Sequence, residues 1–469
     1  MLVLFIILLF FSFSGPGLPV PTTVKRAPPL PVSSSVAHNF RISLPISIDT
    51  SLLTAFGAAL DAEERLWAAV GVSPGKLTLY CSESEGAAWK NVLTVAINES
   101  IPLIEIVAPP VPGPLFIFYL TAADHGDIYL LRFNPVTLDT QRIPVAVGPD
   151  TIDEFTVTVD RDSNYYLYLL FVNEHRTGLN GYFTRSLNKG ITWESPQPFW
   201  NCFDPYLSFG TGSIIHCIWR YAVTGREIHY TANLHYGAPG RWGRLYPIKS
   251  GAERCFTPVL GQSTTAPYWR APVWACWTVA RRDTEMLDIE VALSGDGGRS
   301  WSEIVNLGEM FVDEWSPALI VTTGGADLCY NAGARGENDP TVLNWRTCRP
   351  YAPDLWSSAI RVNAPRVNVW IFGARPRLTP TSHTRPSPPA VFFSCYDPSG
   401  ARGLYFSRIL APAELNRTGN SVVLHPTIEL TGSWYDATGR KIKKFSSDQR
   451  SGLYFQHQGT TIKKLLLIR

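Results

Sequence analysis

The sequence predicts an all-β protein, a β-propeller of six or seven blades with seven preferred, followed by a small C-terminal β-module. A unit of about 50 residues recurs along the chain, and each copy holds four short apolar segments separated by polar turns. A Trp closes the third turn in most copies. A period of this length with four strands in each repeat is typical of propeller blades.

The composition favours sheet over helix and restricts the class of partner. Of 469 residues, 36 are Gly, 37 are Pro and 12% are aromatic, while only 3 are Met. Aromatic residues favour strands, and Gly and Pro favour turns, so neither a helical bundle nor a disordered chain is expected. The net charge is only +2. This balance argues against a general binder of nucleic acid or of anionic membranes, which would carry a basic stripe.

Two N-terminal segments are predicted to precede the propeller. Leu2–Phe11 is an apolar run followed by small residues and prolines, and it is shorter than a membrane span. We interpret residues 1–17 as a signal peptide, with a lipid-facing anchor or a misassigned start as alternatives, since no Lys or Arg precedes the run. Residues 18–38 are Pro-rich and are interpreted as a linker. No second run of spanning length follows, so no transmembrane span is expected in the mature protein.

Residues 39–428 are predicted to form the propeller. Arg41–Ile48 is a candidate for the strand that closes the ring. Leu52–Val70 has a helix-like composition, but its alignment with the other repeats favours a strand hairpin. A double β-sandwich is the rival architecture, since strands at similar spacing can also form one. The strongly apolar strands of the seven repeats are Leu66–Val70, Leu115–Tyr119, Tyr166–Leu170, Ile214–Ile218, Val273–Trp277, Ala326–Tyr330 and Ala390–Ser394.

A turn motif recurs between the last two strands of several repeats. It follows the pattern S-x-[DN]-x-G-x-[ST]-W, and Ser82–Trp89 is a degenerate third copy. In such a turn the Asp or Asn accepts backbone N–H groups, the Gly takes a positive φ, and the Trp packs under the hairpin. The motif residues of the two good copies are Ser294, Asp296, Gly298 and Trp301, and Ser186, Asn188, Gly190 and Trp193.

This motif resembles the Asp-box of sialidases and related propeller proteins. The resemblance implies that the turns are structural and lie opposite the active site, so no catalysis is expected from Asp296 or Asn188. It also implies three arginines, a Tyr–Glu pair and an acidic Asp in any active member. Phe40–Ser43 matches three letters of the family's F-R-I-P motif, but its register places Arg41 on the closing strand. The catalytic residues therefore stay unknown.

Polar loops are predicted to gather on the face opposite the Asp-box turns, because antiparallel blades place alternate connections on one face. Arg suits carboxylate binding, carboxylates suit acid–base chemistry and aromatic rings stack on sugars. Exposed loops of any exported protein are also polar, which is the plainer interpretation. No metal-ligand cluster or nucleotide loop is found, so no metal or cofactor is expected. The candidate ligand-binding residues are Asp204, Arg254, Arg281, Arg282, Glu314, Trp315, Arg335, His175 and Arg176.

The eight cysteines leave two interpretations open. Three pairs lie within single repeats and could face each other, although spacing does not define connectivity. Buried free thiols are the alternative. The pairs are Cys202 with Cys217, Cys255 with Cys276, and Cys329 with Cys348.

Residues 429–469 are predicted to form a separate small sheet. Trp434–Phe445, Ser451–Phe455 and Ile462–Arg469 read as short strands with polar turns. Their order resembles the sorting domain of the type IX secretion system of Gram-negative bacteria. The resemblance implies that the secretion machinery is a partner and that the protein is secreted or held at the outer-membrane surface.

These observations together favour a secreted or cell-surface propeller that binds carbohydrate or protein ligands through its polar loop face. An exo-acting glycoside hydrolase of sialidase type and a structural surface-layer component are the alternatives. Nucleic acid is not an expected partner.

Overall fold

The computed structural model describes most of the propeller and eight strands at or near the chain ends. In chain order these strands are β1 (Val24–Arg26), β2 (Arg41–Ile42), β3 (Ile46–Asp49), β30 (Arg402–Leu410), β31 (Ser433–Asp436), β32 (Lys441–Ile442), β33 (Gly452–Gln458) and β34 (Thr461–Leu467). The other described residues are 53–122, 126–148, 151–160, 164–173, 180–262, 271–282, 284, 286–309, 312–322, 325–333, 342–348, 352–362, 376–379 and 389–396.

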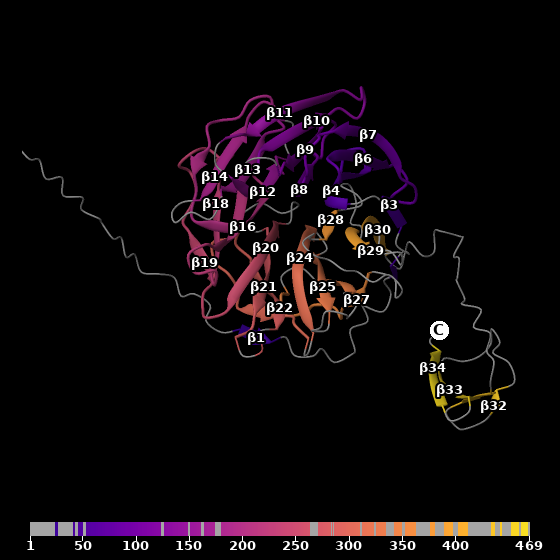
Figure 1. Cartoon of the computed structure of the whole chain (residues 1–469). Coiled ribbons are helices and arrows are strands. Elements are labelled where there is room, and N and C mark those ends of the chain that lie inside the picture. Colours follow the sequence, from indigo (N-terminus) through magenta and orange to yellow (C-terminus); the bar gives the residue numbers. More distant parts are fainter. Residues whose placement is uncertain are drawn as a thin grey trace, which may run out of the picture. The chain divides into compact units, whose positions relative to one another are not determined.

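The protein is a seven-bladed β-propeller, as the sequence predicts (Figure 1). Each blade is an antiparallel sheet with strands A to D from the centre outward. Blade 1 contains β4 (Leu53–Leu60), β5 (Leu66–Val72), β6 (Lys76–Ser82) and β7 (Lys90–Ala96), and blade 2 contains β8 (Leu103–Val107), β9 (Leu115–Leu120), β10 (Ile128–Phe133) and β11 (Thr140–Ala146). Blade 3 contains β12 (Ile152–Val159), β13 (Leu167–Asn173), β14 (Gly181–Ser186) and β15 (Gln197–Pro198), and blade 4 contains β16 (Cys202–Phe209), β17 (Ile215–Tyr221), β18 (Ile228–Asn233) and β19 (Tyr246–Lys249).

The remaining three blades complete the ring. The inner strands contact one another in sequence, β4 with β8 and onward to β28, which contacts β4 again. Blade 5 contains β20 (Arg254–Gln262), β21 (Val273–Ala280), β22 (Leu287–Ser294) and β23 (Ile304–Asn306). Blade 6 contains β24 (Asp313–Thr322), β25 (Gly325–Gly333), β26 (Val342–Cys348) and β27 (Ile360–Arg361). Blade 7 contains β28 (Arg377–Thr379), β29 (Ala390–Tyr396) and β30, and β3 and β2 pair with β30.

The ring is closed by the N-terminal segment. β2 and β3 both pair antiparallel with β30, with Arg41 opposite Leu410 and Ile46 opposite Phe406. The prediction of a closing strand in Arg41–Ile48 is therefore confirmed. Residues 53–72 form the β4–β5 hairpin, which confirms the strand interpretation of this segment. β1 lies within the predicted linker and pairs parallel to β23.

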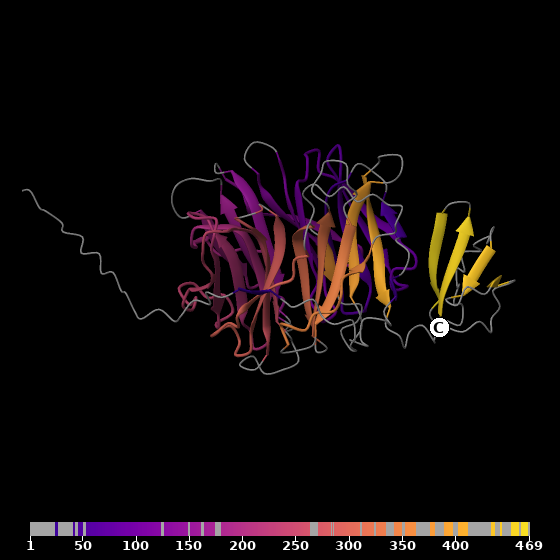
Figure 2. The same ribbon diagram turned by 90° about the horizontal axis from the view of Figure 1, so that it is seen from below.

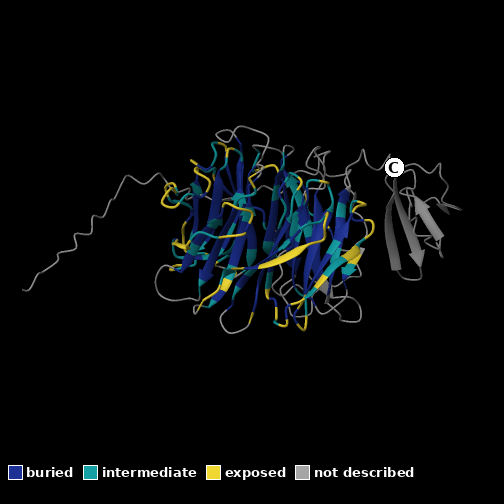
Figure 3. Cartoon of the chain, turned by 90° about the horizontal axis from the view of Figure 1, so that it is seen from above, coloured by how far each residue is buried: buried dark blue, intermediate teal, exposed yellow. Residues whose placement is uncertain are grey.

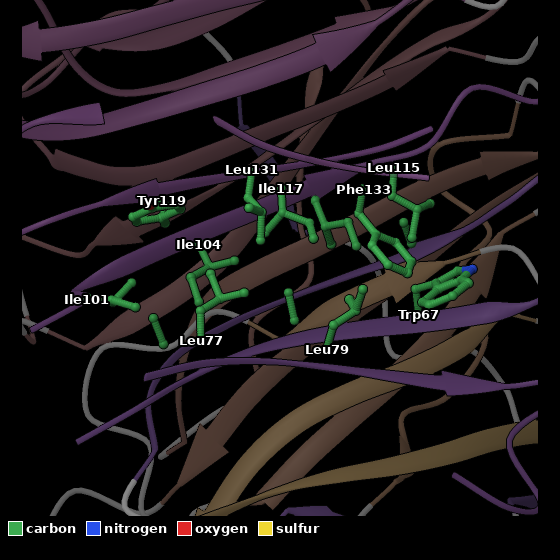
Figure 4. Close-up of a cluster of buried hydrophobic side chains, with 14 of the residues drawn as sticks. Trp67, Leu77, Leu79, Ile101, Ile104, Leu115, Ile117, Tyr119, Leu131 and Phe133 are labelled. Atoms are coloured by element: carbon green, nitrogen blue, oxygen red, sulfur yellow. The ribbon is translucent and has the colours of Figure 1, made fainter. Parts of the chain in front are cut away.

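Apolar side chains between neighbouring blades form the core. Trp67 and Leu79 of blade 1 pack against Ile104, Leu115 and Phe133 of blade 2 (Figure 4). Both faces of a blade meet a neighbour, so a central strand such as β9 is buried at every position. Each large apolar side chain removed from water contributes about 1.5–3 kcal/mol. Exposed residues are concentrated in turns and outer strands (Figure 3).

The seven cysteines whose side chains the structure describes are buried, and each is a thiol rather than half of a disulfide. In the three candidate pairs the partners do not sit opposite each other: Cys202 faces Tyr221, Cys255 faces Val279 and Cys329 faces Trp345. Burial raises the pKa of the Cys202, Cys217 and Cys276 thiols well above the ordinary value. The structure thus agrees with the free-thiol interpretation.

We expect iodoacetamide to leave these seven cysteines unlabelled in the native protein, because a buried protonated thiol is a poor nucleophile. In guanidinium without reductant, all seven should become labelled, as read by peptide mass spectrometry. A pair that labels only after reduction would show a disulfide and contradict this prediction.

A second compact unit comprises Ala413–Arg469. Its described strands form a sheet of order β32-β31-β33-β34 with antiparallel pairing. The expected small C-terminal sheet is therefore present. No helix among the described residues is long and apolar enough to cross a membrane.

Candidate functional site

The propeller has two faces with different connections (Figure 2). Because strands alternate in direction, the A–B and C–D turns lie on one face, here named the turn face. The B–C loops and the starts of the inner strands lie on the other, here named the loop face. The motif Ser294–Trp301 connects β22 to β23 and therefore belongs to the turn face.

A dense hydrogen-bond network shapes this C–D turn of blade 5. Asp296 Oδ1 accepts the Ser294 hydroxyl at 2.8 Å and the backbone N–H groups of Arg299 and Ser300 at 2.9 Å each. The Gly298 N–H donates to Ser294 Oγ at 2.7 Å. These bonds lower the pKa of Asp296, against the opposing effect of its partial burial. Both carboxylate oxygens of Asp296 accept hydrogen bonds from within the turn, so this residue has a structural role.

Asn188 forms the equivalent turn in blade 3. Its Oδ1 lies 3.0 Å from Ser186 Oγ and accepts the Thr192 N–H at 2.9 Å, while the Gly190 N–H donates to Ser186 Oγ at 2.9 Å. Blade 4 has a diverged copy that the sequence pattern missed. There the Gly237 N–H donates to Asn233 Oδ1 at 3.1 Å. An Asn in place of the first Ser hides this copy from the motif.

Each of these turns also packs against the preceding blade. Trp301 meets Tyr230 of blade 4 with ring centroids 5.0 Å apart, and Trp193 meets Phe118 of blade 2 at 5.8 Å. Gly298 has φ +93° and lies against the Tyr230 hydroxyl, so no Cβ fits there. The turns therefore join neighbouring blades, and the structural interpretation of the motif agrees with these contacts.

The loop face carries a repeated backbone feature at the start of three consecutive inner strands. Asp204, Thr257 and Ser316 have φ values of +49°, +47° and +52°, and each lies at a break in the A–B strand register. Each is preceded by an aromatic residue and followed by Pro. Non-Gly residues with positive φ cost of order 1–3 kcal/mol and are concentrated at functional sites. The triplets are Phe203-Asp204-Pro205, Phe256-Thr257-Pro258 and Trp315-Ser316-Pro317.

Hydrogen bonds between blades hold these three bulges. The Asp204 N–H donates to Glu154 Oε1 at 2.7 Å, and the Thr257 N–H donates to Asp204 Oδ2 at 3.2 Å. The Ser316 N–H donates to Thr278 Oγ1 at 3.2 Å. In each case the acceptor belongs to the preceding blade, so blades 3 to 6 present a rigid row of inner-strand starts.

Two arginines and two aromatic rings meet on this row, and we name them the arginine–aromatic cluster. Arg220 Nε donates to Asp204 Oδ2 at 3.0 Å. The Arg220 guanidinium carbon lies 4.8 Å from the Phe203 ring centroid and 5.6 Å from that of Phe256. Arg254, which is exposed, lies 5.1 Å from the same Phe256 ring. Both rings and Arg220 are half-buried. The cluster presents flat apolar surface beside positive charge.

The structure places the other candidate residues differently. Arg281 is half-buried and forms an ion pair with Asp288, whereas Arg282 is exposed. Trp315 is half-buried at the start of β24. Three candidates, His175, Arg176 and Arg335, lie outside the described residues. Arg220 is recognisable from the sequence as a polar residue of a B–C loop but is not among the candidate ligand-binding residues, because only tertiary packing brings it beside both rings.

Glu314 is not at the surface of the loop face, which corrects its expected accessibility. It is 0% exposed, although it lies near the start of β24 beside the half-buried Trp315. Neither carboxylate oxygen has a hydrogen-bond partner of normal geometry among the described residues. Burial raises the pKa of Glu314 to about 8, although the Arg346 charge and the Glu309 backbone oppose the shift. The group is therefore a largely neutral carboxylic acid at pH 7.

A metal centre has no support among the described residues. They contain no group of three or more His, Cys, Asp or Glu side chains that could hold an ion.

Comparisons with known proteins establish the fold. No family model matches the chain, and no curated protein matches it. The BP39L lectin from Burkholderia pseudomallei matches with a TM-score of 0.54 and 10% identity, covering 77% of this chain and 97% of the lectin. This chain shares its propeller fold.

Two further solved structures are more distant. The NanB sialidase from Streptococcus pneumoniae has a TM-score of 0.41 and 12% identity, covering 78% of this chain and 70% of NanB. The Aleuria aurantia lectin has a TM-score of 0.41 and 10% identity, covering 68% of this chain and 99% of the lectin. The neighbours thus include lectins and a sialidase.

Proposed function

We propose that this protein binds carbohydrate at the arginine–aromatic cluster of its loop face. The observation that carries the proposal is the placement of Phe203 and Phe256 beside Arg220 and Arg254 on strained, hydrogen-bonded strand starts. Aromatic faces pack on the C–H groups of sugar rings, and a rigid scaffold lowers the entropy cost of binding. The fold shared with a lectin supports this assignment.

The charge of the cluster favours a sugar that carries an acidic group. Asp204 already accepts a hydrogen bond from Arg220, so that pair is internally balanced. Arg254 is exposed and adds a positive charge beside the Phe256 ring. A guanidinium group binds a carboxylate or sulfate in bidentate geometry. A uronic, sialic or sulfated sugar therefore suits the site better than a neutral one.

Binding rather than hydrolysis is the proposed activity. Catalysis at a sugar requires acids or nucleophiles that reach the substrate. The Glu314 carboxyl is buried, and Asp204 is engaged by Arg220 and Thr257. Neither of these two candidate carboxylates is therefore placed for an acid–base role.

Three sequence-based interpretations accompany this proposal. We propose that the turn motifs of blades 1, 3 and 5 are Asp-boxes, which their Ser, Gly and Trp contacts support. We also propose that residues 1–17 direct export and that residues 429–469 are a type IX sorting module. These would place the protein at the surface of a Gram-negative bacterium or in its surroundings.

A glycan array tests the proposed binding. We expect signal on acidic glycans and a loss of about tenfold or more, 1.4 kcal/mol or above, in each of the variants Phe256→Ala and Arg254→Ala. The control is Arg299→Ala, an exposed arginine on the turn face, which should bind as the wild type does. Thermal unfolding should show that all the variants are folded. Absence of any glycan signal, or equal binding by all three variants, would refute the assignment.

A further inference from the structure

Exposed apolar side chains gather on the turn face. Among the described residues, nine large hydrophobic side chains are exposed, and seven of them lie in C–D turns. Six of these seven belong to blades 2, 3 and 4, which are neighbours in the ring. Singly scattered apolar residues are ordinary, but a contiguous group marks an interaction surface. The six residues, named here the apolar rim, are Val136, Leu138, Leu187, Ile191, Leu234 and Tyr236.

Contacts on the turn face join blades 2, 3 and 4, which carry the apolar rim. Arg185 of blade 3 donates from Nη1 to the carbonyl oxygen of Tyr236 in the blade 4 turn at 2.6 Å. Lys189 of the blade 3 turn lies 4.5 Å above the Tyr165 ring, and the Tyr165 hydroxyl donates to the carbonyl oxygen of Pro112 in blade 2. The three blades are therefore tied together at this face.

The geometry of the turn does not require apolar residues at these positions. In the blade 3 motif, Leu187 and Ile191 occupy variable positions between the Ser, Asn, Gly and Trp that build the turn. The same positions in the blade 5 motif hold Gly295 and Arg299, and the first of them in blade 1 holds Glu83. Burial in the propeller is therefore not the reason for the apolar side chains. A partner outside the propeller explains them.

The charges around the apolar rim are mainly positive. Lys189, Arg241 and Arg244 are exposed in or beside the turns of blades 3 and 4, whereas the described residues of the blade 2 to 4 turns include one exposed acid, Asp139 of blade 2. Glu194 is already paired with Arg185 at 2.9 Å. The chain-wide net charge of +2 conceals this local excess, because acidic residues lie elsewhere. The expected partner is therefore both apolar and anionic.

We propose that the apolar rim docks the propeller on an anionic lipid bilayer. A second copy of the chain would bring the same positive charge to the contact, whereas a bilayer supplies apolar interior and negative headgroups together. Basic residues near such a surface contribute about 1 kcal/mol each, and exposed Leu, Ile and Tyr side chains insert at the interface. Docking by the turn face leaves the loop face directed away from the bilayer.

Vesicle flotation with the full chain tests this proposal. We expect binding to vesicles of phosphatidylcholine with 30% phosphatidylglycerol, little binding to pure phosphatidylcholine, and weaker binding at high salt. The double variants Leu138→Ser/Ile191→Ser and Lys189→Glu/Arg241→Glu should each lower the partition coefficient at least tenfold. The controls are Val147→Ser and Arg282→Glu, exposed residues of the loop face, which should leave it unchanged.

The outcomes separate the possible occupants. Failure of the wild type to bind anionic vesicles, or equal loss in the control variants, would overturn the proposal. Wild-type self-association that is abolished by Leu138→Ser/Ile191→Ser would assign the rim to a second copy and also overturn it. The Phe256→Ala variant should bind vesicles normally, so this test does not depend on the carbohydrate site.

Discussion

Replacing Glu314 by Gln should stabilise the protein at pH 8 by up to about 5 kcal/mol and have little effect at pH 4.5. Burial raises the pKa of Glu314 to about 8 from an ordinary value of 4.5. Between these values the unfolded chain loses the proton while the native state keeps it, so native stability falls as pH rises. Gln has the shape of the protonated acid and does not titrate, so the variant should lose this pH dependence.

Denaturant midpoints of the wild type and variant, measured from pH 4.5 to pH 8.5, provide the test. Glu303→Gln is the matched control, because Glu303 is an exposed glutamate of the neighbouring blade and should show no comparable gain. Parallel pH profiles for wild type and Glu314→Gln would show that Glu314 titrates normally and contradict the burial argument. A buried acid without a hydrogen-bond partner weakens the native state, so a substitution at this position can raise the stability of the protein.

Replacing Gly298 by Ala should destabilise the protein by about 2–4 kcal/mol. The Gly298 φ of +93° is unfavourable for any L side chain, and the added methyl group would overlap the Tyr230 hydroxyl. That hydroxyl cannot easily move, because it lies 2.7 Å from His216 Nδ1, whose other ring nitrogen lies 3.1 Å from Gln262 Oε1. Burial lowers the pKa of His216 to about 4, so this network stays neutral at physiological pH.

The neighbouring Gly295 supplies the control for this variant. It lies in the same turn, has no positive φ and would meet no atom within 4 Å on gaining a Cβ. Gly295→Ala should therefore leave the denaturant midpoint nearly unchanged. Equal midpoints for the Gly298→Ala and Gly295→Ala proteins would show that the turn does not join blades 4 and 5 as described.

Much of the architecture could be predicted from the sequence because blade formation is local. Four strands in about 50 residues pair with their sequence neighbours, so apolar runs and turn residues are sufficient to predict six or seven blades, with seven preferred. The closing strand was also identifiable, since Arg41–Ile48 remained apolar and unassigned before the first complete repeat. Whether the cysteines form disulfides could not be predicted, because pairing depends on which face of a strand each Cys occupies.

The candidate site was only partly predictable. Arg254 and Asp204 were found because they begin inner strands, and the ring topology alone places those starts on one face. Phe256 was missed, although the aromatic-x-Pro triplet recurs in three repeats and was a usable signal. Arg220 was recognisable as a B–C loop residue but was not among the candidates. Glu314 looked like a loop-face acid because it precedes Trp315 at a strand start, but its side chain is fully buried in the folded protein.

By itself the sequence determined the period, the strand order and the turn chemistry, since these depend on residues within one repeat. Tertiary structure alone decided which side chains meet between blades. The burial of Glu314, the approach of Arg220 to the Phe256 ring and the hydrogen bond from Arg185 to the blade 4 turn all depend on how one repeat packs against the next. Such contacts join residues of successive repeats, and no spacing pattern within a repeat records which face of a strand meets its neighbour.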